Sequence, residues 1–333
     1  MIKVLLSQDI HPEGRKLLEG KFDVRIAPGA AEADLIEAAK DVEAIILRTN
    51  AKITRKVIEN APKLKIISRT GAGVDNVDVD AATEKGILVC NLPAVNNVSV
   101  AEHTVALIMH LAKQLSTMDR AVREGKWNMR NSNIAVELEG KILGVVGMGN
   151  IGALVAKKCH DGLGMKILAY DPYTEERFKD YDYEFTDDLE ELFRRSDFVT
   201  LHCPDTPETR GMVKRDLIYS MKPTAYLINT ARGTLVDEKS LIMALKERRI
   251  AGAGLDVFTE EPPKEDNELL KLDNVVLSPH SAAMTKEATT RMSTEAAQAV
   301  VDYFEGRQPK YIFNGNELRK KGIRLYFEME KLL

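Results

Sequence analysis

The sequence has 333 residues, of which 44% are hydrophobic and 29% are charged, and its formal net charge is −4. This length and composition predict about two globular domains, each with its own core, and exclude a disordered chain. There is no long block of Lys and Arg, which argues against a nucleic-acid partner, and no apolar segment approaches the eighteen residues of a membrane span. The first residues carry no secretory signal pattern, so we expect a cytoplasmic protein without membrane contact.

The alternation of short apolar runs with amphipathic stretches predicts βα units around parallel sheets, and therefore an α/β fold. Helical stretches such as ADLIEAAK and TRKVIENA separate the runs of the first part and begin after small or polar residues. This part predicts one doubly wound unit. Its expected strands are 3–7, 23–27, 44–48, 64–68 and 87–91.

A long helix is predicted from Ser99, where Glu102 follows three positions later as a capping box. Its length suits a connector between two domains. After a polar stretch around Trp127 the βα rhythm starts again, with strands expected at 142–148, 165–171, 198–203, 225–231, 251–258 and 274–280. A last helix from about Thr285 to Gly306 would return the chain to the first domain. The tail after Pro309 shows no pattern that we can interpret.

A glycine-rich turn predicts a dinucleotide site. Gly147, Gly149 and Gly152 form GxGxxG directly after a predicted strand and at the start of a helix. Glycine allows a close approach of the backbone to a pyrophosphate, which the positive end of the helix stabilises. Asp171 ends the next strand, where an acid accepts both ribose hydroxyls and repels a 2′-phosphate. We therefore expect NAD rather than NADP.

Three polar residues follow the carboxyl ends of later predicted strands, where ligands collect in open α/β sheets. They are Arg232 in NTARG, Glu261 in DVFTEEP and His280 in LSPHSA. Each has an ordinary alternative by itself: a surface charge, a solvated turn and a packed histidine. The three cysteines, Cys90, Cys159 and Cys203, stand outside CxxC pairs, so we expect neither a disulfide framework nor a bound metal.

Taken in order, seven segments resemble the D-isomer-specific 2-hydroxyacid dehydrogenase family from Ser68 to His280. The segments are SRTGAGVDNVD, NNVSVAEHTVALIM, LEGKILGVVGMGNIG, LHCPDTPETRGMV, INTARGTLVDEKSL, AGLDVFTEEPP and SPHSAAMTKEA. The resemblance implies two doubly wound α/β domains with the cleft between them. Residues 1–98 and 286–333 would form a flavodoxin-like substrate domain, and 99–285 a Rossmann NAD-binding domain.

The resemblance also implies roles that fit the chemistry of the residues. His280 would be the general acid and base, and Glu261 would fix its tautomer and favour the protonated ring. Arg232 would hold the substrate carboxylate and polarise the carbonyl. Further residues implied to bind the cofactor are Asn150, Ile151, Cys203, Thr230 and Asp256. The loop Gly71, Ala72 and Gly73 would offer backbone amides to the carboxylate.

Arg48 and Arg69 match positions where the branch of the family that acts on D-3-phosphoglycerate carries arginines, which makes that acid the expected substrate. Hydroxypyruvate, glyoxylate and D-lactate stay open as alternatives. The same family contains corepressors that use the fold mainly to bind protein partners, a third and weaker hypothesis. No segment matches the regulatory domain that many phosphoglycerate dehydrogenases carry, so serine feedback through it is not expected. A homodimer, or a dimer of dimers, is predicted from the apolar faces of the Ser99 helix. The resemblance also implies it, since members of the family pair through this region.

Overall fold

The chain divides into two units in the computed structural model, which describes residues 1–132, 135–173 and 175–323. Unit 1 consists of Met1–Asn96 together with the chain from Met284 onward, and unit 2 of Asn97–Ala283. Residues 324–333 of the tail lie outside the described part. No helix in the described ranges is long and apolar enough to span a bilayer.

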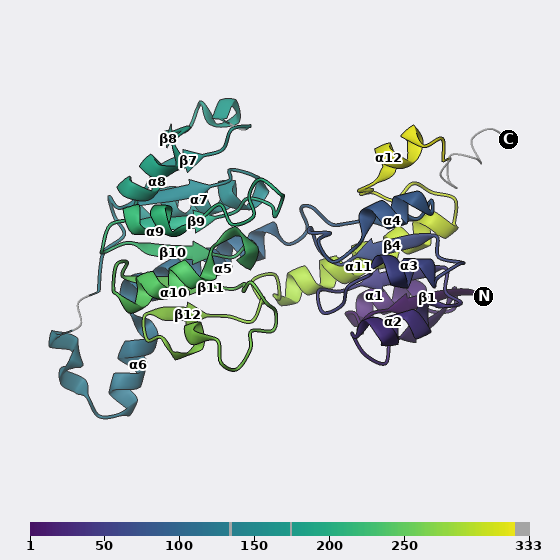
Figure 1. Ribbon diagram of the computed structural model, residues 1–333, viewed down its shortest axis with the longest axis horizontal. Helices are drawn as coiled ribbons and strands as arrows, with labels where there is room; N and C mark the ends of the chain where they lie inside the picture. Colours follow the sequence, from purple (N-terminus) through teal and green to yellow (C-terminus); the bar gives the residue numbers. More distant parts are fainter. Residues whose placement is uncertain (133–134, 174, 324–333) are drawn as a thin grey trace. The chain divides into compact units, whose positions relative to one another are not determined.

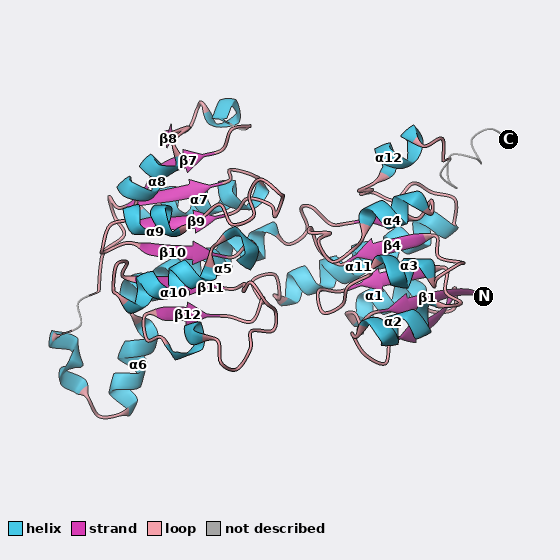
Figure 2. Cartoon of the chain, viewed as in Figure 1, coloured by secondary structure: helices cyan, strands magenta, loops and turns pink. Residues whose placement is uncertain are grey.

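Unit 1 is a parallel sheet with helices on both faces (Figures 1 and 2). The sheet has five strands in the order β2-β1-β3-β4-β5. This is the flavodoxin-like order. The five predicted strands are confirmed to within two residues. The elements are β1 (Ile2–Leu6), α1 (Pro12–Leu18), β2 (Phe22–Ile26), α2 (Glu32–Ala39), β3 (Ala44–Leu47), α3 (Arg55–Glu59), β4 (Ile66–Arg69), α4 (Val79–Glu84), β5 (Leu88–Cys90), α11 (Lys286–Phe304) and α12 (Gly315–Lys320).

Successive strand residues of unit 1 point to opposite faces and bury both of them. On one face Leu5 and Ile45 join a core with Leu35 of α2 and Val57 of α3. On the other face α1 and α11 cover the sheet, where the hydroxyl of Ser68 donates to the carbonyl of Ala296 at 2.9 Å. The helix that returns from unit 2 therefore completes the core of unit 1.

The tail that showed no pattern packs on unit 1 as far as it is described. The amide of Asn314 is buried, accepts from the backbone of Val89 at 2.9 Å and donates to the hydroxyl of Thr83 at 2.9 Å. Leu318 of α12 is completely buried. Because Asn314 satisfies backbone groups beside β5, this segment closes that edge of the sheet.

Unit 2 is a seven-stranded parallel sheet in the order β12-β11-β10-β9-β6-β7-β8, which is the Rossmann order with one additional strand (Figure 2). The connection changes direction between β6 and β9, and ligands bind at such a switch point. The elements are α5 (Asn97–Lys113), α6 (Leu115–Arg123), η1 (Trp127–Asn131), β6 (Ile142–Val146), α7 (Asn150–Leu163), β7 (Lys166–Tyr170), η2 (Glu175–Phe178), β8 (Tyr183–Phe185), α8 (Leu189–Arg195), β9 (Phe198–Leu201), α9 (Arg215–Ser220), β10 (Tyr226–Asn229), η3 (Gly233–Leu235), α10 (Glu238–Lys246), β11 (Gly252–Leu255), η4 (Glu268–Lys271) and β12 (Val275–Leu277).

Six strands of unit 2 were expected, and each lies inside its predicted range. The strand β8 was missed. It has three residues, Tyr183–Phe185, within the acidic stretch KDYDYEFTDD, so no apolar run announces it. It forms because β7 offers a free edge to pair with, which is a tertiary rather than a local cause.

The predicted start of the Ser99 helix is two residues too late, and the predicted cap is wrong. Helix α5 begins at Asn97, and Ser99 lies buried within its first turn, so Ser99 does not cap the helix. Glu102 instead pairs with Lys158 of α7 at 3.4 Å. The helix stops at Lys113 because Gln114 adopts a left-handed φ of 53°, and α6 then continues in a new direction.

The apolar faces of α5 are also covered within unit 2, contrary to the reason given for a dimer. Leu107 and Leu111 pack on β11, where a Cβ on Gly254 would lie 3.2 Å from each of these side chains. Ile108 is completely buried. Gly254 thus lets the helix lie close to the sheet, and Val98 is the one large hydrophobic side chain of α5 that is exposed.

Candidate active site

A glutamate and a histidine form the centre of the candidate site. His280 follows β12 and Glu261 follows β11, and Nδ1 of His280 lies 2.6 Å from Oε2 of Glu261. The other carboxylate oxygen, Oε1, accepts the backbone N–H of Phe258 at 3.1 Å. The two side chains keep 29% and 33% of their surfaces exposed, so the imidazole is oriented while a small molecule can still reach it.

Glu261 is held in its charged form by its surroundings. Burial alone raises the pKa of its carboxyl, but the hydrogen bond and charge of His280, the N–H of Phe258 and the charge of Arg232 together place that pKa below its usual value. A charged Glu261 can only accept hydrogen bonds. It therefore requires a proton on Nδ1 of His280, and acid–base exchange would use Nε2.

Arg232 lies in the turn after β10. The side chain of Asn229 donates to the carbonyl of Arg232 at 2.8 Å and accepts from the N–H of Ala231 at 3.0 Å, which holds the turn closed. The next residue, Gly233, must lack a side chain because a Cβ there would overlap the backbone of Phe258. The turn with Arg232 is thus packed against the segment that leads to Glu261.

The predicted catalytic residues consequently come from the carboxyl ends of three neighbouring strands, β10, β11 and β12. The structure joins Glu261 and His280 directly, and Arg232 acts on Glu261 through its charge. The sequence analysis did not identify Asn229 as the residue that holds the Arg232 turn, although Asn229 stands in the same NTARG segment. An Asn two or three residues before a turn is a local signal that could have indicated this role.

The glycine turn between β6 and α7 has the shape that a dinucleotide needs. Gly147 has a φ of 94°, and a Cβ there would lie 2.8 Å from the backbone nitrogen of Cys203. A Cβ on Gly152 would overlap the carbonyl oxygen of Gly147. At Gly149, which caps α7, a Cβ would meet no described atom within 4 Å. The turn is therefore closely packed at Gly147 and Gly152 and open at Gly149. At this open end Asn150 and Ile151 begin the helix, and a pyrophosphate would fit at the helix N-terminus.

Asp171 lies directly after β7, beside this turn. Its two oxygens accept the backbone N–H groups of Met148 at 2.7 Å and Tyr173 at 2.9 Å. These bonds hold a carboxylate where the ribose of an adenine dinucleotide would lie. Cys203 and Thr230 follow β9 and β10, at the same edge of the sheet.

Asp256 is fully buried, and its carboxylate faces the segment that carries His280. Its oxygens accept the hydroxyl of Ser278 at 2.6 Å and the N–H groups of Ser281 and Ala282 at 2.9 Å each. Its own carbonyl accepts the N–H of His280 at 2.8 Å. A role of Asp256 toward the nicotinamide carboxamide stays a prediction, while these contacts hold the segment that carries His280 in place.

The expected anion-binding residues of unit 1 form a separate group. Arg69 ends β4, is 6% exposed and donates to the hydroxyl of Thr49 at 3.1 Å. A Cβ on Gly71 would overlap the guanidinium of Arg69, so this glycine makes room for it. Arg48 follows β3 and donates from Nη1 to the carbonyl of Asp9 at 2.8 Å.

The loop Gly71 to Gly73 is oriented by the residues after β5. The carbonyl of Gly71 accepts from the N–H of Leu92 at 2.9 Å, and that of Ala72 from the amide of Asn91 at 2.7 Å. In a trans peptide the carbonyl and the next N–H point in opposite directions. The N–H groups of Ala72 and Gly73 therefore point away from β5, as an anion loop requires. Asn91 was missed because its partner is nineteen residues away.

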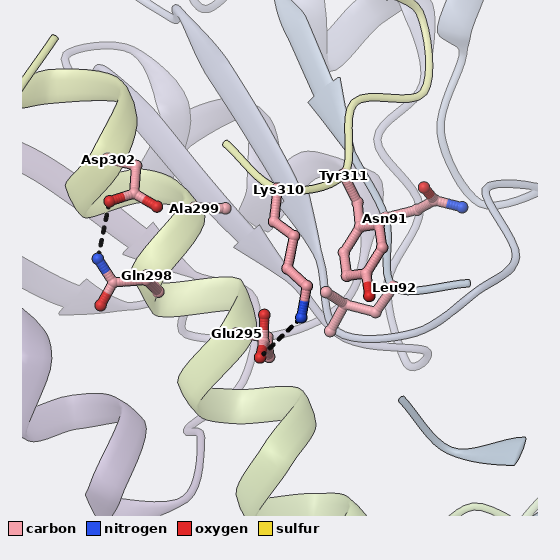
Figure 3. Close-up of a pocket in the computed structure, with 8 residues that line it drawn as sticks. All are labelled: Asn91, Leu92, Glu295, Gln298, Ala299, Asp302, Lys310 and Tyr311. Carbon is pink, nitrogen blue, oxygen red and sulfur yellow. Dashed lines mark hydrogen bonds and ion pairs between the residues drawn. The ribbon is translucent and has the colours of Figure 1, made fainter. Parts of the chain in front are cut away.

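Asn91 also borders a small hollow between α11 and the segment after it (Figure 3). Lys310 lies 3.6 Å from Glu295 there, and Gln298 donates to Asp302 at 2.8 Å. None of the predicted site residues lines this hollow. Its lining is Asn91, Leu92, Glu295, Gln298, Ala299, Asp302, Lys310 and Tyr311.

Comparison with known proteins identifies the family. The model of the D-isomer specific 2-hydroxyacid dehydrogenase, NAD binding domain, matches residues 105–282. The chain belongs to the D-isomer-specific 2-hydroxyacid dehydrogenases. A nicotinamide dinucleotide is therefore its cofactor, and the Gly147 to Gly152 turn has the form to hold one.

The chain is 44% identical to D-3-phosphoglycerate dehydrogenase of Methanocaldococcus jannaschii over 94% of its length, but spans 60% of that relative. It is 41% identical to the glyoxylate reductase of Korarchaeum cryptofilum, with 94% and 96% of the two chains covered. Among solved structures it is similar to D-lactate dehydrogenase from Aquifex aeolicus complexed with NAD and lactic acid. That similarity has a TM-score of 0.84 and 33% identity, over 91% and 96% of the chains.

Proposed function

We propose that this dehydrogenase oxidises D-3-phosphoglycerate to 3-phosphohydroxypyruvate with NAD, and catalyses the reverse reduction. The observation that carries the proposal is the 2.6 Å contact between His280 and Glu261 beside the turn of Arg232. The identities of 41–44% to phosphoglycerate dehydrogenases support the substrate.

The chemistry follows from the protonation of the pair. In oxidation, Nε2 of His280 takes the proton of the C2 hydroxyl, and Glu261 stabilises the imidazolium that results. The bound nicotinamide supplies the acceptor for the hydride of C2. In reduction, the same Nε2 returns the proton to the carbonyl oxygen. Arg232 would hold the carboxylate of the acid with two parallel hydrogen bonds, which fixes the face of C2 presented for reaction.

The substrate proposal adds a second anion site in unit 1. The backbone amides of Ala72 and Gly73 would bind the carboxylate of the acid, and the guanidiniums of Arg48 and Arg69 would bind its phosphate. A phosphorylated acid has two such groups, whereas glyoxylate or D-lactate has one. The arginines are therefore the feature that separates the candidate substrates.

The direct test measures NADH formation with D-3-phosphoglycerate, D-lactate, D-glycerate and glycolate, and the reverse reaction with the oxo acids. Selective turnover of D-3-phosphoglycerate is expected. Arg69→Ala should lower kcat/KM for it about tenfold to a hundredfold, the effect of one lost charged hydrogen bond, and that for D-glycerate far less. Arg55→Ala is the control. Arg55 lies on α3, and its guanidinium pairs with the carboxylate of Glu84 at 2.7 Å. Equal losses of kcat/KM for both acids in Arg69→Ala would refute the proposed phosphate site.

Glyoxylate or hydroxypyruvate reduction is the second candidate. It is favoured by the Korarchaeum cryptofilum relative, which this chain covers over 96% of its length. Turnover restricted to unphosphorylated acids would establish it and leave the roles of His280, Glu261 and Arg232 unchanged. Binding of NADH without turnover of any acid would instead favour a role in protein binding.

We infer a preference for NAD over NADP from Asp171. Its carboxylate is held beside the glycine turn by two backbone N–H groups and would accept the ribose hydroxyls. A 2′-phosphate at the same place would meet a like charge. The ratio of kcat/KM for NAD and NADP tests the preference.

We further propose a homodimer formed through α6 and η1, which follow α5. Within them Leu115, Val122 and Trp127 expose 53%, 58% and 61% of their surfaces. Light scattering should then give twice the chain mass of 37.1 kDa. Val122→Glu should halve the mass, and Met243→Glu, at an exposed methionine of α10, should not. A monomeric wild type would refute the dimer.

A further inference from the structure

Two adjacent side chains of α5 contact both segments that carry the proposed catalytic residues. Nε2 of His103 lies 2.9 Å from the hydroxyl of Ser278, two residues before His280. The hydroxyl of Thr104 lies 2.8 Å from that of Thr230, two residues before Arg232. One helix therefore touches the ends of both β10 and β12 with polar groups.

The contact of His103 continues to the buried Asp256. The hydroxyl of Ser278 has one proton and gives it to Oδ1 of Asp256 at 2.6 Å, because a carboxylate only accepts. The oxygen of Ser278 must then accept a hydrogen bond from Nε2–H of His103. Nε2 of His103 is also 3.7 Å from the same carboxylate oxygen. The result is a directed chain from His103 through Ser278 to Asp256.

This chain fastens a strained segment. His280 has a φ of 49°, a left-handed conformation that a residue with a Cβ adopts only when its surroundings hold it. Asp256 holds the segment on both sides of the histidine, since it binds the hydroxyl of Ser278 and the N–H groups of Ser281 and Ala282. The conformation that places the imidazole beside Glu261 thus depends on Asp256 and on what orients it.

The contact of Thr104 is equally directed and fully buried. Its hydroxyl donates to the carbonyl of Val100 at 2.8 Å, so the hydroxyl of Thr230 must donate to Thr104. Thr104 has no exposed surface and Thr230 is 7% exposed. A buried hydroxyl without its partner is costly, so this bond resists displacement of the Arg232 turn.

We propose that His103 and Thr104 are positioning residues, through which α5 holds His280 and Arg232 in place for hydride transfer. Neither would touch the substrate or the cofactor. The proposal rests on the proposed function for its kinetic readout, but its geometry concerns the hydrogen bonds of unit 2 alone.

The principal test compares His103→Leu with His103→Gln, whose side-chain amide retains an N–H donor, and with His110→Leu on the same helix. His110 accepts from the N–H of Ser116 at 3.3 Å, beyond the catalytic segments. We expect His103→Leu to lower kcat about tenfold, the effect of one hydrogen bond, with KM and NADH affinity within about twofold of wild type. His103→Gln should recover most of kcat, and His110→Leu should match wild type.

Thr104→Val and Thr104→Ser form the second pair and cover the case in which His103→Leu folds poorly. Thr104→Val should mainly raise KM for the hydroxy acid, because it loosens the Arg232 turn, and Thr104→Ser should restore it. Wild-type kcat in His103→Leu together with wild-type KM in Thr104→Val would overturn the proposal while leaving the proposed function intact.

A readout without turnover separates the two hypotheses. If the wild type converts none of the acids, the proposed function fails, and the ring signals of His280 in a ¹⁵N-histidine NMR spectrum then decide the inference. His103→Leu should shift or broaden those signals, whereas His110→Leu should leave them in place. Unchanged His280 signals in His103→Leu would refute the positioning role.

Discussion

Replacing two neighbouring glycines of the nucleotide turn by alanine should separate folding from cofactor binding. At Gly147 an alanine must keep a φ of 94°, and its Cβ would lie 2.8 Å from the nitrogen of Cys203 and 2.9 Å from the carbonyl carbon of His202. The conformation costs about 1–2 kcal/mol and the overpacking about 1–3 kcal/mol. Gly147→Ala should therefore lower the free energy of unfolding by about 2–5 kcal/mol.

Gly149→Ala should instead leave the stability almost unchanged and weaken the binding of NADH. Gly149 has a φ of −67°, and its Cβ would meet no described atom within 4 Å. The lower entropy of the unfolded alanine chain offsets the weaker N-cap, two effects of about 0.5–1 kcal/mol each, so stability should hardly change. The new methyl group would occupy space proposed for the pyrophosphate. The Kd for NADH should rise about tenfold or more, a loss of at least about 1.4 kcal/mol.

Urea unfolding and NADH titration measure the two quantities for each variant. Gly162→Ala is the matched control, since Gly162 is exposed in α7, far from the turn in sequence, with nothing described within 4 Å of its Cβ. It should gain about 0.5–1 kcal/mol of stability and bind NADH normally. Wild-type stability in Gly147→Ala, or wild-type NADH affinity in Gly149→Ala, would show that the assigned roles of these glycines are wrong.

Three further predictions follow from the site and the core. Glu261→Gln removes the charge beside His280, which the low pKa of Glu261 maintains at neutral pH, so the imidazolium formed in oxidation loses its charged partner and kcat for oxidation should fall about tenfold or more. A wild-type kcat in Glu261→Gln would contradict the pairing. Burial raises the pKa of Cys90 and Cys159 to about 12, so only about one thiol in ten thousand is ionised at pH 8, and Ellman's reagent should modify them only after unfolding. Peptide mass spectrometry checks this, and rapid labelling of the native protein would oppose it. Asp171→Ser should reduce the preference for NAD over NADP about tenfold or more, as one charge removed near a phosphate implies, and an unchanged ratio of kcat/KM would place the ribose elsewhere.

Several features of the fold could be predicted because their causes are local. Apolar runs that are buried on both faces mark the strands of parallel sheets, and eleven of the twelve strands in the described residues carried such a run. The exception, Tyr183–Phe185, has no run and forms only by pairing with β7. The capping signal at Ser99 also misled, because α5 already begins at Asn97 and Ser99 is buried within its first turn.

The sequence by itself determined the types and order of the chemical groups. Each candidate site residue stands at a fixed distance in the sequence from the end of a predicted strand, so the sequence shows its position. This holds for the glycine turn, Asp171, Arg232, Glu261 and His280. The same spacing does not show which side chains contact these residues in the folded protein.

Only the tertiary structure decided what holds the proposed catalytic groups. Ser278 and His103 are 175 residues apart, and Thr104 and Thr230 are 126 apart, so no local pattern could pair them. Their hydrogen bonds exist because α5 packs on the same sheet whose strand ends carry His280 and Arg232. The partner of a buried polar group is set by three-dimensional packing, since a folded core leaves it few other groups to bind.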